Sequence, residues 1–397
     1  MCILEHAVRT TLETLWGLII VGSHSNQNER NMRLYLIIFI FFLSCSSKST
    51  YENDSQIEIT ELENLGELKL ILDSEVSSML LNFIVYDEYV DEILIIPSGV
   101  NKIKRFSAET GELLGDIFLE REGPNGVGNV DVYNFVVQPI SKDKLLLAAK
   151  WHETLYFLNR KGEVIEKFRL EDLNIESSFL NHFSKIIYQD SLMILPTLDA
   201  LKESGLDFIY YAIDLKSKNK KGIVPISNDF NELSVRLNDP YERSNTFGGD
   251  GALITLFPFR DSLLIWRDGR SKLIPLQTGA LKANIYPKNI DAYWQKVGEY
   301  GELSYKETFS KLKNISYVPY NDQYILNYDI GEPISSVKKY PSGIIILDKD
   351  FKILAHVVRE MDFSQYFLVR KDQILVASAT KTKSEDELVF DVLALPK

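Results

Sequence analysis

One short phrase recurs along the chain and constrains its fold more than any other feature. Each copy holds an apolar run, a polar or charged turn, an aspartate and a second apolar run, as in FLVRKDQILVA (367–377). The aspartates that mark the copies are Asp91, Asp143, Asp190, Asp261, Asp322 and Asp372. A phrase repeated at this spacing predicts one supersecondary unit that is used six times.

Each copy reads as a β-hairpin. The apolar runs are short and rich in Ile, Leu, Val, Tyr and Phe, which is typical of strands. Aspartate favours the turn because its carboxylate accepts hydrogen bonds from nearby backbone N–H groups. The second run, such as DEILII from Asp91, is almost continuously apolar. This predicts a strand that is buried on both faces between stacked sheets.

A second, more polar hairpin follows in most copies. KIKRFSAETGELLGDIFL (102–119) and SKLIPLQTGALKANIYP (271–287) both turn at Thr-Gly, and 154–170 and 344–358 share the layout. Each unit therefore holds four strands, and repeated four-stranded units indicate propeller blades. The sequence predicts an all-β fold, a six-bladed β-propeller with four-stranded blades.

The sixth unit lacks a fourth strand, because its strands are expected near 364–369, 373–379 and 388–395. A strand-like segment, IEITELENLGELKLILD (57–73), precedes the first unit. We expect this N-terminal strand to complete the last blade and close the ring, so that the propeller covers 57–397. The alternative is that 57–73 forms an independent hairpin.

The net charge excludes two classes of partner. The chain has 44 Lys and Arg residues against 56 Asp and Glu residues, which gives a net charge of −12. Such a chain repels nucleic acid and anionic membrane surfaces, so we expect neither as a direct partner.

The N-terminal part reads as an export signal. Residues 34–43, LYLIIFIFFL, are apolar throughout and follow Arg33. They are too few to span a bilayer, which needs roughly 20 residues in a helix. They do fit the apolar centre of a secretory signal. We expect translation to start at Met32, which makes 1–31 a mis-assigned leader and 32–44 the signal peptide.

The apolar run ends in Phe42-Leu43-Ser44-Cys45, which resembles a bacterial lipobox with Phe42 in place of the usual leucine. The resemblance implies that Cys45 is lipidated and anchors the chain to a membrane, with each buried CH₂ group worth ~0.8 kcal/mol. An ordinary signal peptide with an incidental cysteine is the alternative. Residues 45–56 are polar without an apolar period, which predicts a flexible, lipidated tether.

The residues after the cysteine bear on localisation. Ser46 and Ser47 follow Cys45, and no acidic residue stands directly after it. By the rule known for the lipoproteins of enteric bacteria, this disfavours retention in the inner membrane. We therefore expect an outer-membrane lipoprotein, on either the periplasmic face or the cell surface.

The mature chain as a whole resembles the TolB-like six-bladed propeller lipoproteins of Bacteroidota. The repeat and the lipobox carry this resemblance, together with EGPNG (122–126). That segment is similar to the Gly-Pro-Gly-Glu junction of the family, with Asn125 where glycine is usual. The resemblance implies the fold and an envelope location, and it implies no catalytic residue.

The two faces of such a ring differ in their connections. If the first strand of each blade runs from the top face to the bottom face, the aspartate turns lie at the bottom. Connections between second and third strands, and between blades, then lie at the top. Four long insertions fall on the top face: 198–206, 227–251, 288–314 and 330–341. Long loops gathered on one face of a repeat array usually mark the binding face.

One of these insertions is expected to be helical. Within 288–314, Ile290, Tyr293, Trp294 and Val297 recur at helical spacing, and Asp291 stands in the first turn. Such a helix could lie across the central channel as a lid. The alternative is that it packs on the rim.

Six polar residues are candidate ligand contacts: Asp131, His152, His182, Asp250, Arg267 and Asp362. They are expected where innermost strands begin or near turns between second and third strands. Such groups could hold a cation, a sugar or a peptide end, and Trp266 beside Arg267 suits stacking on a sugar. The alternative is that they end loops and bind water. Asp268-Gly269 is itself a strong hairpin-turn pattern.

No motif of known chemistry appears. The histidines of the mature chain are His152, His182 and His356, and none shows metal-ligand spacing. No G-x-S-x-G elbow is present. With Cys45 as its single cysteine, the mature chain has no disulfide, and we expect no cofactor and no metal.

Three functions remain open from the sequence. The first is binding of a glycan, a peptide or a partner protein through the top-face loops. The second is a hydrolase or lyase that acts on glycans or peptides with channel carboxylates, since propeller active sites draw single residues from different blades. The third is a component of an envelope complex.

Overall fold

The computed structural model describes residues 61–73, 75–76, 83–97, 99–130, 135–149, 154–173, 186–189, 191–196, 208–225, 243–258, 260, 262–276, 290–300, 311–329, 341–360, 367–378 and 381–396. Residues Gln56–Lys397 form one compact unit. The predicted leader (1–31), signal peptide (32–44) and tether (45–56) lie outside the described residues and stay predictions.

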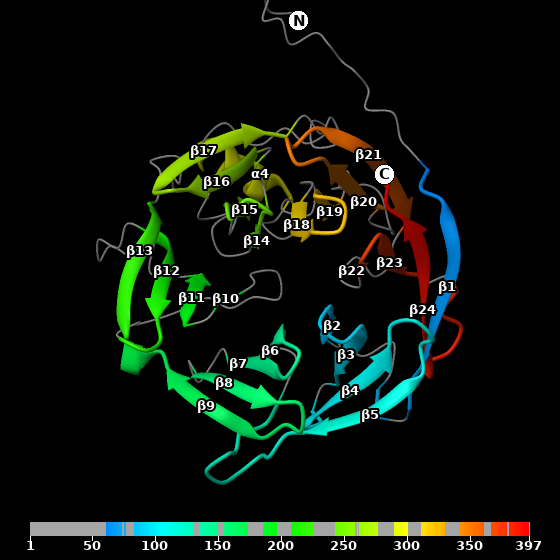
Figure 1. Cartoon of the computed structure of the whole chain (residues 1–397). Coiled ribbons are helices and arrows are strands. Elements are labelled where there is room, and N and C mark those ends of the chain that lie inside the picture. The colour runs from blue at the N-terminus through cyan, green and yellow to red at the C-terminus, as the bar shows by residue number, and fades with distance from the viewer. Residues whose placement is uncertain are drawn as a thin grey trace, which may run out of the picture. The chain divides into compact units, whose positions relative to one another are not determined.

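In the described part of the chain, the strands form six four-stranded antiparallel sheets around a central axis, with the first strand of each innermost (Figure 1). The first three sheets are β2 (Phe83–Asp87), β3 (Glu92–Ile96), β4 (Lys102–Ser107) and β5 (Leu113–Phe118); β6 (Phe135–Ser141), β7 (Lys144–Ala149), β8 (Thr154–Asn159) and β9 (Val164–Arg169); and β10 (Ile187–Gln189), β11 (Leu192–Pro196), β12 (Phe208–Asp214) and β13 (Asn219–Pro225). The predicted six-bladed β-propeller is confirmed.

The other three sheets include the one that joins the two ends of the propeller. They are β14 (Ser244–Phe247), β15 (Leu253–Leu256), β16 (Ser262–Arg267) and β17 (Arg270–Pro275); β18 (Lys311–Val318), β19 (Gln323–Asp329), β20 (Pro341–Leu347) and β21 (Ile353–Glu360); and β22 (Phe367–Arg370), β23 (Gln373–Ala377), β24 (Glu387–Ala394) and β1 (Asn64–Ile71). The described helices are the 3₁₀ turn η1 (Glu171–Leu173) and α4 (Ile290–Tyr300).

The burial of each strand follows its place in the blade. The second strands β3 and β7 are buried almost throughout, whereas the outer strand β17 is exposed along most of its length. The apolar clusters join neighbouring blades; one, for example, contains Ile254, Ile315 and Tyr324 of the fourth and fifth blades. The core therefore lies between the blade faces, as expected for strands that are apolar on both sides.

The fourth blade differs from the sequence prediction by one strand. We expected Asp261 to mark the turn between the first and second strands, but residue 261 falls between β15 and β16, the second and third. The true first strand, β14, reads Ser-Asn-Thr-Phe and has no apolar run. Thr246 on this strand is buried, and its Oγ1 accepts a hydrogen bond from the Tyr317 N–H of the next blade at 3.1 Å.

The last blade takes its outer strand from the N-terminal side of the propeller. β1 pairs antiparallel with β24 from Asn64 opposite Leu393 to Ile71 opposite Glu387. Leu68 and Leu70 of β1 are buried in a cluster shared with Phe106 of the first blade. That this strand locks the ring stays a prediction.

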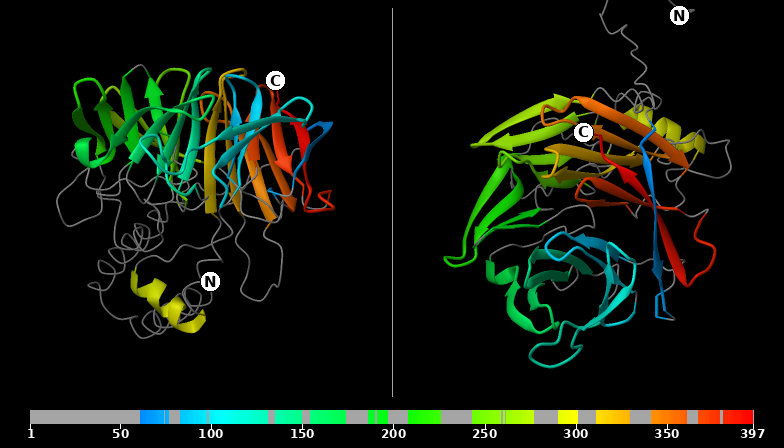
Figure 2. Two further views of the ribbon diagram at one scale, coloured as in Figure 1. Left: turned by 90° about the horizontal axis from the view of Figure 1, so that it is seen from below. Right: turned by 45° about the vertical axis from the view of Figure 1, so that its right-hand side comes forward.

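The predicted helix within 288–314 is confirmed as α4. It belongs to the connection between β17 and β18. With the ring seen edge-on, the helix lies beyond the ends of the strands, off one face of the ring (Figure 2, left). Trp294 on this helix is 43% exposed. None of the helices in the described residues is both long enough and apolar enough to cross a bilayer.

Candidate functional site

Asp250 lies on the face opposite the one predicted for it. It belongs to the Gly248-Gly249-Asp250-Gly251 turn between β14 and β15, the first and second strands of the fourth blade. This turn therefore belongs to the bottom face, with the aspartate turns of the other blades. The predicted insertion 227–251 accordingly ends before β14. The error has the same cause as above, because the polar strand β14 carries no apolar signal.

The turn itself is tightly built. The Gly251 N–H donates to the Gly248 carbonyl at 2.9 Å, and the Asp250 Oδ1 accepts from the Ala252 N–H at 3.0 Å. Gly251 has φ +77, a conformation that suits glycine. Asp250 thus has the role that aspartate was predicted to have in the repeat, at a position where the repeat was not recognised.

Arg267 meets Asp250 on this bottom face. It ends β16, directly before the two-residue turn Asp268-Gly269, and forms an ion pair with the Asp250 carboxylate. Asp268 and Gly269 have φ 50 and φ 76, which confirms the predicted hairpin turn. Both partners of the ion pair are about half exposed, and exposed pairs contribute little to stability. Their charged groups remain accessible to a ligand.

Aromatic side chains of the fifth blade lie beside this pair. Tyr324 stacks on Phe351 with ring centroids 4.9 Å apart, and Tyr317 lies 5.2 Å from Tyr324. A side chain at Gly249 would collide with the Tyr317 hydroxyl, since a Cβ there would lie 2.1 Å from it. The glycines of the turn therefore let the fourth blade pack closely on the tyrosines of the fifth.

The chemistry of these tyrosines is that of neutral donors. Burial raises the pKa of Tyr317 to about 12, and the Asp322 carboxylate contributes to this shift. The Tyr317 hydroxyl donates a hydrogen bond to that carboxylate at 2.8 Å. Burial also raises the pKa of Tyr324 to about 12. At neutral pH both phenols are protonated, so they can donate hydrogen bonds but cannot act as bases.

His356 is a core residue. It lies on β21, is 5% exposed, and its Nε2 is hydrogen-bonded to the Tyr328 hydroxyl of β19. Burial lowers the pKa of His356 below its usual value. Gly343 lies between the two strands, and a Cβ there would come within 2.2 Å of the Tyr328 ring. Within the described residues, no group of His, Cys, Asp and Glu could hold a metal ion.

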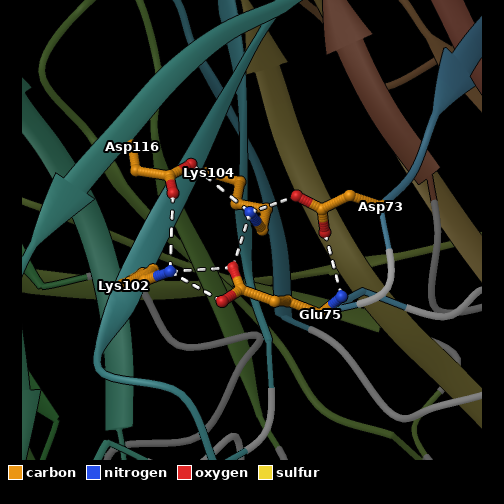
Figure 3. Close-up of polar contacts among 5 residues, drawn as sticks. All are labelled: Asp73, Glu75, Lys102, Lys104 and Asp116. Carbon is orange, nitrogen blue, oxygen red and sulfur yellow. Dashed lines mark hydrogen bonds and ion pairs between the residues drawn. The ribbon is translucent and has the colours of Figure 1, made fainter.

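A network of five charged residues was not foreseen (Figure 3). The side chain of Lys104 is 2% exposed, and its Nζ lies 2.6 Å from Asp73, 3.0 Å from Glu75 and 3.4 Å from Asp116. Lys102 lies 2.7 Å from Glu75 and 3.8 Å from Asp116. Burial acts to lower the pKa of Lys104, but the carboxylates together outweigh it and raise this pKa above its usual value. The hydrogen bonds from Lys102 and Lys104 lower the pKa of Glu75.

This network is a structural device. Asp73 and Glu75 follow β1 of the last blade, while the other three residues lie on β4 and β5 of the first blade. A fully protonated lysine held by carboxylates is a poor nucleophile and a poor base. The sequence did show the two alternations, Lys102 with Lys104 and Asp73 with Glu75, but nothing in it showed that they would meet.

The structure does not describe the other four predicted ligand contacts. Asp131, His152, His182 and Asp362 lie outside the described residues, as does the predicted lipidation site Cys45. In chain order, these four residues fall in connections of the top face. The two candidates within the described residues, Asp250 and Arg267, are brought together at the bottom face.

The top face is distinguished by the length of its connections. On the bottom face, residues 142–143, 268–269 and 371–372 suffice to join strands. On the top face, 226–243 and 276–310 join blades, while 197–207 and 330–340 join second to third strands. By chain order, the four predicted insertions therefore fall between strands that are connected at the top face, and the second one ends before β14.

Comparison with known proteins finds the same architecture in solved structures. A member of the DUF4221 family from Bacteroides vulgatus matches with a TM-score of 0.60 and 16% identity, over 84% of this chain and 98% of that one. A protein described as exported, from Bacteroides fragilis, matches with a TM-score of 0.51 and 12% identity, over 85% of this chain and 98% of that one.

At these identities the likeness shows the fold alone. No protein-family model matches the chain, and the search of curated proteins found no match. The comparisons therefore support a six-bladed propeller and carry over no site residue.

Proposed function

We propose that this chain is a lipid-anchored propeller of the bacterial cell envelope that binds a glycan, a peptide or a partner protein through its top face. The observation that carries the proposal is the difference between the two faces. The bottom face has minimal turns, whereas the top face bears 226–243, 276–310 and two further long connections. A rigid scaffold with variable loops on one face is the usual arrangement of a binding module.

The anchor is the second part of the proposal. Its support is the apolar run 34–43 followed by the lipobox-like sequence that ends in Cys45. The proposed location is the outer membrane, on the periplasmic face or at the cell surface. The likeness in fold to an exported propeller agrees with an envelope location.

Acyl labelling tests the anchor. Cells that express the full chain are grown with an alkyne fatty acid, and the purified protein is examined for the label. We expect labelling of the wild type and its loss in the Cys45→Ala variant. Equal labelling of both forms, or a soluble wild type, would show that no lipid is attached at Cys45.

A melting screen tests the binding. Residues 46–397 are melted with glycans, peptidoglycan fragments, peptides and divalent ions, with EDTA as a control. A ligand present at about 100 times its Kd stabilises the fold by about 2.7 kcal/mol, which a melt detects. We expect one class of compound to raise the melting temperature. If none does, the binding proposal is left with a protein partner, which is sought by pull-down from envelope extracts.

The enzyme alternative needs channel carboxylates that lie close to one another. Among the candidate contacts, Asp250 is in a bottom-face turn and is paired with Arg267. Any compound that stabilises the chain can be tested directly for turnover.

A further inference from the structure

The chain enters the propeller at its bottom face. The Glu63 carbonyl, directly before β1, accepts from the Ala394 N–H at 2.9 Å, and the next residue, Leu395, donates its N–H to the Asp372 carbonyl at 2.8 Å. Asp372 is in the turn between the first and second strands of the last blade. Glu63 is therefore held beside a bottom-face turn.

A third contact fixes the same end of the chain. The Gln323 Nε2 donates to the Pro396 carbonyl at 2.8 Å, and Gln323 begins β19 directly after another bottom-face turn, 319–322. Residues 394–396 thus lie against the bottom ends of inner strands in the fifth and last blades. Leu62 packs beside them, in the cluster that those two blades share.

Few residues, 46–62, separate the proposed anchor from Glu63. As a flexible chain, residues 46–62 would have an r.m.s. length of roughly 20–25 Å. A domain of this size has a radius of gyration of roughly 20 Å. A tether of that length reaches the bottom face directly. To turn the top face toward the bilayer, it would have to run around the rim in a stretched and entropically costly form.

The lengths of the connections on the two faces also favour an arrangement with the bottom face toward the bilayer. The bottom-face turns are as short as 142–143 and 371–372, so little chain projects from that side. The top face carries the connection 276–310, and the helix α4 of this connection lies beyond the ends of the strands (Figure 2, left). A face of short turns can approach a bilayer closely, whereas long connections would hold the ring away from it.

We infer that the anchored chain turns its bottom face to the bilayer and presents its top face to the aqueous compartment. The partner of the top face is then one that arrives from the aqueous side, not one embedded in the same bilayer. This inference rests on the proposed anchor at Cys45, and it adds to that proposal the orientation of the binding face.

Fluorescence energy transfer tests the orientation. Cys45 is the single cysteine of the predicted mature chain, and in the lipidated protein its thiol is blocked by the lipid. A cysteine introduced elsewhere is then the one free thiol, and a fluorophore can be attached to it specifically. Lys142→Cys reports on the bottom face and Arg121→Cys on the top face, near the first and second blades. Tyr320→Cys and Gln295→Cys form a second pair near the fifth blade. All four side chains are exposed.

The lipidated full chain is reconstituted into vesicles of phosphatidylethanolamine and phosphatidylglycerol that contain an acceptor-labelled lipid. We expect several-fold higher transfer from the bottom-face variant of each pair. Equal transfer, or higher transfer from the top-face variants, overturns the orientation and leaves the anchor intact. Failure of every variant to associate with vesicles, with an unmodified Cys45 by mass spectrometry, overturns the anchor and the orientation together.

Discussion

Asp91 and Arg370 are joined by two hydrogen bonds, although they belong to the first and last blades of the ring. The Arg370 Nε donates to the Asp91 Oδ1 at 2.8 Å, and the Arg370 Nη2 donates to the Asp91 Oδ2 at 2.9 Å. The Lys371 Nζ and the Tyr86 hydroxyl donate to the same carboxylate at 2.9 and 3.0 Å. The first and last blades, which meet at the seam of the ring, are therefore joined by two sets of ionic contacts. One is the Asp91–Arg370 pair at the bottom face, and the other is the Lys104 network, which includes Asp73 and Glu75 directly after β1.

Removal of the charge of Asp91 should weaken this seam. Asp91 has φ 57, which asparagine tolerates, so Asp91→Asn tests the charge without backbone strain. We expect a loss of roughly 1–3 kcal/mol in the free energy of unfolding, measured in urea, because the arginine loses a charged acceptor.

Asp322→Asn is the matched control for this variant. Asp322 has φ 53 in the equivalent turn, and its carboxylate accepts the Tyr317 hydroxyl within the same blade. A smaller loss is expected because no ion pair is broken. An equal loss in both variants would show that the turn, and not the seam, is what matters at Asp91.

The same carboxylate predicts a pH dependence. The hydrogen bonds from Arg370 hold the pKa of Asp91 well below its usual range. A depressed pKa stabilises the fold above the unfolded pKa of about 3.9, and this contribution is lost as the pH falls through the folded pKa. The urea midpoint of the wild type should therefore fall more steeply below about pH 4 than that of Asp91→Asn. Parallel curves would refute the assignment.

Two neighbouring residues test whether β1 is an integral part of the last blade. Leu70 is fully buried and Ile71 is 59% exposed, although both lie on the same strand. Leu70→Ala should cost about 2–5 kcal/mol of unfolding free energy through the lost contacts and the cavity. Ile71→Ala should stay within about 0.5 kcal/mol. Similar small effects from both would mean that β1 is not required for a closed ring.

The Lys104 network is tested by Lys104→Met, which keeps the length of the side chain and removes its charge. Breaking a fully buried pair costs roughly 3–5 kcal/mol, and we expect about 1–3 kcal/mol because the carboxylates are partly exposed. Lys102→Met is the control: Lys102 contacts Glu75 and Asp116 as well, but its side chain is 23% exposed. The Lys102 variant should lose less in urea denaturation, and the reverse order would contradict the network as described.

The sequence predicted most of the fold because the repeat is local. The hairpins at Asp91, Asp143, Asp322 and Asp372 follow from short apolar runs around a turn residue, which neighbours in the chain largely determine. The prediction for the fourth blade was wrong because β14 is a polar strand without an apolar run. This strand is stabilised by hydrogen bonds to another blade, such as the one between Thr246 and Tyr317.

The candidate site was harder to predict for the same reason. Arg267 and Asp250 lie in one blade but in different hairpins, so their meeting depends on the register of that blade. The error in the register moved Asp250 to the wrong face. The Lys104 network depends on contacts between the first and last blades, which no pattern in a single sequence specifies.

The claim that the top face binds the partner is tested most directly by hydrogen–deuterium exchange. Residues 46–397 would be compared with and without the compound that raises the melting temperature most. We predict slower exchange in 197–207, 226–243, 276–310 and 330–340, with the bottom-face turns 142–143, 319–322 and 348–352 unchanged. Protection confined to the bottom-face turns, including the one that holds Asp250, would contradict the account.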